Sequence, residues 1–267
     1  MSAARPLWLR LLHSVWLRPV LLLIILLVIW DIVIRVFAIP PYLIPTPASV
    51  VEALVEEWPR LFGESLVTTY ATLGGFGLSI AFGIPMALAI AYSRTVESFV
   101  YPLLVFSQSV PKVAIAPLFV VWFGFGILPK IIVAFLLGFF PVVVSTVMGF
   151  KSVEADMLDL ARSMKASKFQ IFLRISLPQA LPSIFAGLKV SVTLAVVGAV
   201  VGEFVGSNSG IGYVLQIANG NFDLPLMFAA LLVLSMIGLL LFIVVDMIER
   251  LMIPWHASQR GGIQATA

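Results

Sequence analysis

The chain contains no cysteine, which excludes disulfide bonds and thiolate metal sites. Its two histidines, His13 and His256, lie near opposite ends, so we expect neither a zinc site nor a histidine base. Charged residues make up 11% of the 267 positions, whereas soluble domains carry roughly a quarter. The net charge of +3 is too small a surplus to indicate a nucleic-acid partner. So little charge cannot coat a water-facing surface, and the composition is that of a membrane protein.

Catalytic motifs are absent as well. The sequence has no HExxH pattern, no serine–histidine–acid set and no Walker A loop ending in GK[ST]. It also has no series of acids within its apolar segments that would indicate proton or sodium coupling. We therefore expect a chain that is not an enzyme, does not hydrolyse ATP and holds no cofactor of its own.

Long apolar runs are present instead: 61% of the residues are hydrophobic, and the mean hydropathy is +1.12. Arg5, Arg10 and Arg18 before the first run are typical of a signal peptide. The run continues past Asp31 and Arg35 without a small-residue cleavage site, which favours an uncleaved span. A helix needs about 20 apolar residues to cross the hydrocarbon core. The sequence thus predicts an all-α polytopic membrane protein with six transmembrane helices, at 19–38, 68–92, 99–123, 127–150, 181–205 and 224–248.

Lysine and arginine are distributed unevenly between the two sides that six spans create. Cytoplasmic loops carry the positive excess, so the richer side is expected in the cytoplasm with both termini. This predicts a cytoplasmic segment 1–18, a single transmembrane domain 19–250 and a cytoplasmic tail 251–267. The poorer side holds Arg60 and Lys130. The richer side holds Arg5, Arg10, Arg18, Arg94, Lys151, Arg162, Lys165, Lys168, Arg174, Arg250 and Arg260.

A short amphipathic helix is predicted in the outside loop, residues 40–70. Thr46 or Ser49 would cap it, and Val50, Leu54 and Trp58 would share its apolar face. It either lies flat on the outer leaflet or offers a docking surface to an outside partner, and the sequence leaves both open.

Proline interrupts several of the predicted spans. The third contains Val110-Pro111-Lys112 and the fourth contains Pro141. Broken backbone at membrane depth is tolerated only where protein or a water-filled cavity surrounds it, and such breaks recur in transporters. Glycines in the second and fifth spans would let helices approach closely. These are Gly74, Gly77, Gly198 and Gly202.

Ionisable residues within spans are candidate functional groups because their burial is costly. Asp31 and Arg35 are spaced to pair across one helical turn, and Lys189 lies where it can snorkel to the interface. Lys112, between two prolines, either faces the pathway and attracts an anion or is a snorkelling or carbonyl-bonded lysine. We expect the pathway to be lined by Ser107, Gln108, Lys112 and Glu203.

A charged segment separates the fourth and fifth spans. We call residues 151–178 the charged loop. Over 154–165 its pattern predicts a helix with Ala155, Leu158 and Ala161 on one face and charges on the other. Such a helix can rest on a membrane surface, but those helices are usually basic, whereas this one mixes acids and bases. The pattern favours docking into a groove of a cytoplasmic protein.

The spacing within this loop resembles the EAA loop of ATP-binding-cassette (ABC) importer permeases. Asp159-Leu160-Ala161 stands where the family has Glu-Ala-Ala, and Ile175 and Leu177-Pro178 follow at the expected offset. The family's glycine falls on Lys165. Glycine there permits a turn with positive φ, so a lysine must accept roughly 1 kcal/mol of strain or use another turn.

The resemblance extends to LIPTPASVVEAL (43–54), SQSVPKVAIAPLFVVWFGFG (107–126) and GEFVGSNSGIGYVLQIANGNFD (202–223), which are similar to permeases of the nitrate, sulfonate and taurine group. It implies a type I ABC-importer fold in the bacterial inner membrane, with the charged loop as coupling helix. Implied partners are a second permease copy, a cytoplasmic ATPase dimer that binds ATP and Mg, a periplasmic or lipid-anchored binding protein, and lipid. The implied ATPase contacts are Asp159, Leu160, Ala161, Arg162, Lys165, Ala166 and Ser167.

The implied cargo is a small organic or inorganic anion or a vitamin precursor, and Lys112 favours an anion. The alternative function is a self-contained secondary transporter or channel, which would need buried coupling acids or an inverted repeat. A membrane scaffold is a third possibility, but it would have no need of broken spans.

Overall fold

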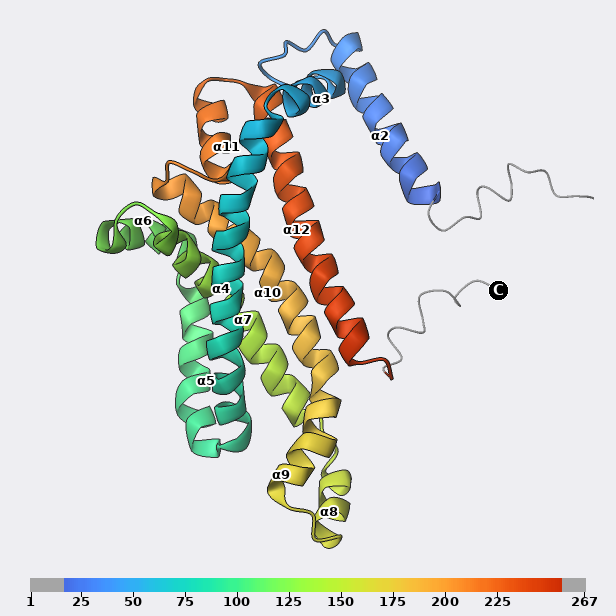
Figure 1. The fold of residues 1–267 in the computed structure, drawn as a ribbon, viewed down its shortest axis with the longest axis vertical. Coiled ribbons are helices and arrows are strands. Elements are labelled where there is room, and N and C mark those ends of the chain that lie inside the picture. Colours follow the sequence, from blue (N-terminus) through green and yellow to red (C-terminus); the bar gives the residue numbers. More distant parts are fainter. Residues whose placement is uncertain (1–16, 256–267) are drawn as a thin grey trace, which may run out of the picture.

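The structure is a computed structural model that describes residues 17–255. Within that range every regular element is helical (Figure 1). The N-terminal segment and the end of the tail, for which we expect a cytoplasmic location, lie outside the described residues. The helices are α2 Leu17–Val36, α3 Pro47–Glu56, α4 Trp58–Tyr92, α5 Arg94–Ser109, α6 Lys112–Phe123, α7 Ile127–Lys151, α8 Ala155–Ser163, α9 Lys168–Ile171, the π-helix η1 Phe172–Ser176, α10 Leu177–Gly206, α11 Ile211–Gly220 and α12 Leu224–Met252.

Among residues 17–255, four stretches are long and apolar enough to cross a membrane: Trp58–Tyr92, Ile127–Lys151, Lys168–Gly206 and Leu224–Met252. A fifth span forms if α5 and α6, bent by 93° at their junction, count as one. The described part of the chain is therefore all-helical, and the protein is multi-pass. The remaining predicted span, 19–38, overlaps α2, which touches α12 where Trp30 meets Phe228 and then diverges from it (Figure 1). The predicted Asp31–Arg35 ion pair is present on α2, at 2.7 Å.

The predicted break at Val110-Pro111-Lys112 is present, because α5 ends at Ser109 and α6 begins at Lys112. The predicted interruption at Pro141 is not, since α7 runs through it unbroken. Proline removes one backbone donor and usually kinks a helix, but neighbouring helices can accommodate that loss inside a membrane protein. Pro141 lies where α7 is packed against α10, as the close approach of its carbonyl to Gly187 indicates.

Helix α7 is held between α4 and α10 at very short range. A Cβ added to Gly75 of α4 would lie 2.4 Å from Ala134 Cβ. A Cβ added to Gly198 of α10 would lie 2.6 Å from the same residue's Cα. Small residues allow helix backbones to approach in this way. The three helices therefore form the closely packed centre of the bundle.

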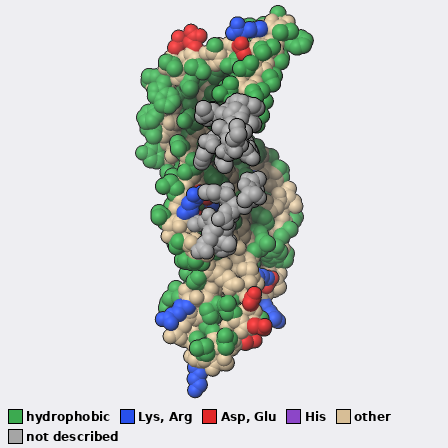
Figure 2. Space-filling model, turned by 90° about the vertical axis from the view of Figure 1, so that its right-hand side faces the viewer, with side chains coloured by type: hydrophobic (Ala, Val, Ile, Leu, Met, Phe, Trp, Pro, Cys, Tyr) green, Lys and Arg blue, Asp and Glu red, His purple; other side chains and the backbone are tan. Residues whose placement is uncertain are grey.

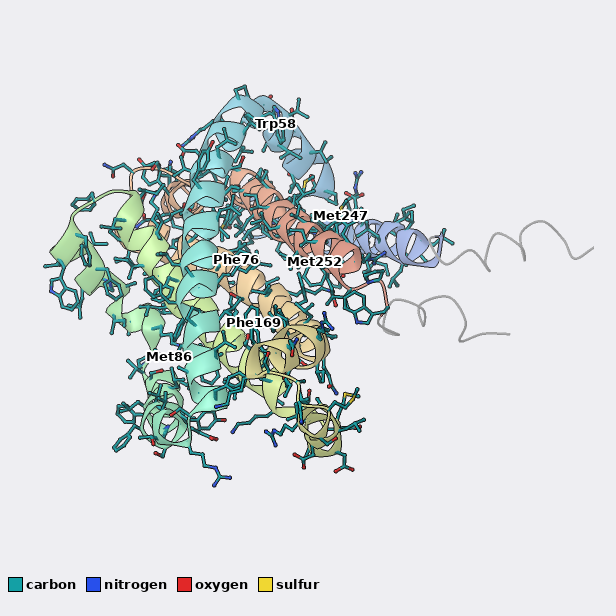
Figure 3. All side chains as sticks on the ribbon, turned by 60° about the horizontal axis from the view of Figure 1, so that its bottom comes forward. Trp58, Phe76, Met86, Phe169, Met247 and Met252 are labelled. Carbon is teal, nitrogen blue, oxygen red and sulfur yellow. The ribbon has the colours of Figure 1, made fainter. Side chains whose placement is uncertain are left out.

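The two ends of the bundle differ. At one end α3 and α11 lie against the start of α12, around the buried residues Val50, Leu61 and Ile211. Thr46 caps α3, as predicted, by accepting the Ser49 N–H at 3.2 Å. Trp58 marks the corner from α3 into α4 (Figure 3). At the other end α8 and α9 project beyond the long helices (Figure 1). Charged side chains gather mainly at these two ends of the face in Figure 2.

Candidate functional site

The charged loop forms a compact projection made of α8, α9 and η1. Ala161 is buried and Leu158 half-buried, so they form the inward face of α8. Leu160 and Met164 are 63% and 75% exposed. The predicted apolar face is therefore divided, because Leu158 and Ala161 pack within the loop whereas Ala155 is exposed. Asp159 and Arg162, which the sequence placed on the contact surface, pair with each other at 2.7 Å and stay exposed.

The turn after α8 has the backbone form that the glycine comparison predicted, but with a lysine in it. Lys165 has φ +60°. Its N–H donates to the Arg162 carbonyl at 2.9 Å, and the Ala166 N–H donates to the Ala161 carbonyl at 3.1 Å. These two bonds form a Schellman motif with Lys165 at the left-handed position that glycine usually occupies. Lys165 therefore keeps the turn geometry and accepts the strain, roughly 1 kcal/mol.

The next helix begins immediately after this turn. The Gln170 N–H donates to Ser167 Oγ at 3.2 Å, and the Ser167 N–H donates to Gln170 Oε1 at 2.8 Å, which is a capping box. Ala166 and Ser167 thus form the corner between α8 and α9. A shallow hollow of about 360 Å³ adjoins that corner and is bordered by Lys165 and Arg174. The structure brings all seven of the predicted contact residues, 159–162 and 165–167, into this one projection.

Both ends of the charged loop are tied to other helices. At its start, Lys151 forms an ion pair with Glu97 of α5. At its end, the Phe172 ring stacks on the ring of Phe150 at 5.9 Å and meets the Tyr92 ring at 6.2 Å. Phe172 opens η1, and π-helical turns are rare and often occur at functional sites.

The predicted pathway residues fall into two places. Ser107 and Lys112 border a cavity of about 380 Å³ between the α5–α6 junction and α7. Gln108 is linked to this cavity through Lys112, whose Nζ donates to Gln108 Oε1 at 3.1 Å. Glu203 is not at this cavity. It is fully buried near the opposite end of α7 from the charged loop.

The surroundings of Glu203 form a polar cluster that links four helices. Its carboxylate accepts the Thr68 hydroxyl at 2.9 Å and the Gly212 N–H at 2.8 Å. Lys130 Nζ lies 3.9 Å from Glu203 Oε1 and donates to the Ser209 carbonyl at 2.8 Å. The sequence assigned Lys130 to the outer side, at the start of the span 127–150, whereas its side chain is 1% exposed. The sequence showed one ionisable residue at the edge of each of two apolar runs. It did not indicate that Lys130 and Glu203 contact each other.

A second charged cluster joins α10 to α12. Lys189 Nζ contacts Asp246 Oδ1 at 2.5 Å and also Glu249, and Arg250 contacts Asp246 at 2.8 Å. The sequence suggested a snorkelling Lys189 and did not identify its partners. Within residues 17–255 no group of three or more histidine, aspartate or glutamate side chains is placed to hold a metal ion.

Comparison with known proteins gives relatives along nearly the whole chain. The formylaminopyrimidine transport permease protein ThiX of Halalkalibacterium halodurans is 41% identical over 91% of this chain and 97% of its own length. The riboflavin transport system permease protein RibX of Chloroflexus aurantiacus is 36% identical, covering 88% of this chain and 89% of its own. A putative aliphatic sulfonates transport permease protein, SsuC of Bacillus subtilis, is 31% identical, covering 92% and 90%.

A chain of the MetNI methionine ABC transporter in an inward-facing conformation has a similar fold. Its TM-score is 0.60 at 18% identity, and the match covers 73% of this chain and 96% of that one. The family model described as "Binding-protein-dependent transport system inner membrane component" matches residues 79–254, which include the charged loop, the α5–α6 junction, Lys130 and Glu203. The chain therefore belongs to the family of inner membrane components of binding-protein-dependent transport systems.

Proposed function

We propose that this chain forms the translocation pathway of an ABC importer together with a second copy. We also propose that a cytoplasmic ATPase dimer binds its charged loop and displaces it. The observation that carries this proposal is the Schellman turn at Lys165, at the position of the family's glycine. It joins α8 to α9 in one projection with Leu160 and Met164 open to solvent. Exposed apolar side chains on such a helix suit a groove in a partner protein.

We further propose six spans, with α2 as the first, and both termini in the cytoplasm. Helix α2 is 20 residues long, which is sufficient to cross the hydrocarbon core. Most of its described side chains are apolar and exposed within this single chain, as expected for contact with lipid or a second copy. The charged loop carries Lys151, Arg162 and Lys165, whereas Arg60 lies near the other end of the bundle. This asymmetry favours a cytoplasmic loop. On this topology 19–250 is a single transmembrane domain between segments 1–18 and 251–267.

In this arrangement ATP and Mg belong to the ATPase, and a periplasmic or lipid-anchored binding protein delivers the cargo. The helix α3 and the start of α12 lie at the end of the bundle away from the charged loop, where delivery would occur (Figure 1). The relatives' names cover formylaminopyrimidine, riboflavin and aliphatic sulfonates. The cargo class therefore includes vitamin precursors and organic anions.

The charged loop is attached to other helices by two contacts, which explain how binding of the ATPase to the loop can affect the pathway. Lys151 connects the loop to α5, one wall of the cavity at Lys112, through Glu97. Phe172 connects it to α4 and α7 through Tyr92 and Phe150. A displacement of α8 and α9 by the ATPase would therefore reach α5 through the Lys151–Glu97 ion pair and the closely packed α4–α7–α10 centre through Phe172.

The test is co-purification with a candidate ABC ATPase from the same organism. We expect wild type to retain the ATPase, and Asp159→Lys and Leu160→Asp to release it. Leu251→Asp, at an exposed apolar site on α12 outside the loop, is the matched control and should retain it. Ala161→Trp is less suitable, since Ala161 is buried and the change would disturb the loop itself. If wild type binds no ATPase, or both loop variants bind normally, the coupling role is wrong and a self-contained transporter becomes the better explanation.

A further inference from the structure

The cavity between the α5–α6 junction and α7 has a composition that selects for a particular kind of cargo. It measures about 380 Å³, within the range of small-molecule sites. Three phenylalanines of α7, Phe135, Phe139 and Phe140, form much of one wall, and Lys112 and Ser107 border the other. An apolar, aromatic lining with few polar groups is the usual form of a site for a small organic molecule.

The position of this cavity matches that of a transport site. Its phenylalanines lie near the midpoint of α7, which runs from Ile127 to Lys151. Its other wall is the junction where α5 and α6 bend by 93°. Transporters commonly bind cargo near the centre of the membrane, beside broken helices.

The rings of the aromatic wall are held in place from behind. The Phe135 and Phe139 centroids are 5.3 Å apart, and Phe82 of α4 meets Phe135 edge-on at 6.1 Å. Phe135, Phe139 and Phe140 are each half-buried, so part of each ring remains open. Fixed, partly open rings can stack against or meet the edge of another ring without losing much side-chain freedom.

Lys112 provides the polar end of the cavity. Its Nζ donates to Gln108 Oε1 at 3.1 Å. No carboxylate among residues 17–255 forms an ion pair with it. An ammonium group has three donors, so two remain for a carbonyl, carboxylate or phosphate on a ligand. Ser107 adds little, because its hydroxyl already donates to the Leu104 carbonyl.

We propose that this cavity is a subsite for a flat, ring-containing compound whose edge carries a hydrogen-bond acceptor or negative charge. The ring would contact Phe135 and Phe139, and the acceptor would meet Lys112. A small aliphatic or inorganic anion would use Lys112 alone and leave the aromatic wall without a partner. This inference rests on the proposed transport function and narrows its cargo to the ring-containing class.

The first measurement is direct binding to the permease–ATPase complex in lipid nanodiscs, without the binding protein. The probes are riboflavin, followed by quenching of its fluorescence, a radiolabelled aminopyrimidine, and taurine as the aliphatic competitor. We expect at least one ring probe to bind and taurine not to displace it. Phe139→Leu should weaken that binding about two- to tenfold, the size of one aromatic contact, and Lys112→Gln should weaken it while Lys112→Arg restores it.

The matched control is Phe228→Leu, because Phe228 is also half-buried and aromatic but packs against Trp30 on α2. It should bind the ring probe as wild type does. The proposal is overturned if neither ring probe binds, if taurine displaces them, or if Phe139→Leu and Phe228→Leu have equal effects. A complex that forms with the ATPase and binds taurine but no ring compound would leave the proposed function intact and contradict this substrate class. Failure to form that complex would instead contradict the proposed function.

Discussion

The rings of Phe150 and Phe172 are stacked, with their centroids 5.9 Å apart and their planes 13° from parallel. Phe150 is one residue from the end of α7, where the chain enters the charged loop, and Phe172 opens η1 in the last part of the loop. Tyr92, the last residue of α4, contacts both rings. Three aromatic side chains thus join the two ends of the loop to the closely packed α4–α7 pair, so the loop cannot move without affecting this contact.

Removal of that contact should separate ATP hydrolysis from transport. In Phe172→Leu we expect the ATPase still to bind and hydrolyse ATP, because α8 is unaltered, while the solute moved per ATP falls several-fold. Each aromatic pair contributes about 0.5–1.5 kcal/mol beyond its burial, so the fold itself should survive. The measurement is the ratio of uptake to ATP hydrolysis in proteoliposomes. Phe172→Tyr retains the ring and should behave as wild type. If uptake and ATP hydrolysis fell in parallel in Phe172→Leu, Phe172 would not transmit the movement of the loop to the pathway.

The charged-loop turn gives a prediction about stability. In Lys165→Gly the left-handed φ of +60° no longer strains a side chain, so we expect the free energy of unfolding to rise by up to about 1 kcal/mol. Lys165→Ala removes the same charge and side chain but keeps the strain, so it should show no such gain. Thermal unfolding in detergent compares the two variants. Equal stabilities for Gly and Ala would mean that the turn relaxes when the lysine is lost.

Much of this fold was accessible from the sequence because local chemistry determines it. Pro111 has no N–H to continue α5, and the helix does end there. The spacing around Lys165 indicated either a strained turn with positive φ or another turn geometry, and the structure has the positive φ. Pro141 gave the same local signal as Pro111 but leaves α7 unbroken. The difference comes from tertiary neighbours, since α7 is enclosed between α4 and α10 at that level, and no local pattern encodes this.

The pairing of charged residues that lie far apart in the chain could not be predicted from the sequence either. Lys130 and Glu203 each stand at the margin of an apolar run, and Lys189 and Asp246 each interrupt one. Whether such residues meet depends on the rotation of each helix about its axis, and one residue of difference turns a helix by about 100°. The sequence therefore identified ionisable residues of interest but assigned Glu203 to the pathway, a role that its burial neither requires nor tests.

The buried Lys130–Glu203 pair predicts strongly non-additive mutations. Glu203→Leu alone leaves the Lys130 ammonium without its counter-charge, which should cost about 3–5 kcal/mol. Lys130→Met alone has the opposite defect. The double variant removes both charges, and we expect it to be less destabilised than the sum of the two. Unfolding of all four proteins in one detergent completes the cycle. Additive losses would show that the 3.9 Å separation carries no coupling and that the Thr68 and Gly212 contacts stabilise Glu203 alone.

Two glycines that look alike in the sequence should respond oppositely to alanine. A Cβ at Gly198 would lie 2.6 Å from Ala134 Cα and 2.8 Å from the Val133 carbonyl oxygen, which are backbone atoms and cannot rotate away. Gly198→Ala must therefore separate α10 from α7, and overpacking of this kind typically costs about 1–3 kcal/mol. A Cβ at Gly77 on α4 would meet nothing within 4 Å.

Gly77→Ala should be neutral or stabilising, because alanine favours a helix over glycine by roughly 0.5–1 kcal/mol. Both substitutions add one methyl group to a long apolar helix, so any difference between them reports packing and not composition. The comparison is thermal unfolding of the two variants beside wild type, with ATPase co-purification as a check on the native fold. If Gly198→Ala proved as stable as Gly77→Ala, then α7 and α10 would be farther apart than this structure places them. The close packing of α4, α7 and α10 would then be wrong. So would the proposal that movement of the charged loop is transmitted through these helices.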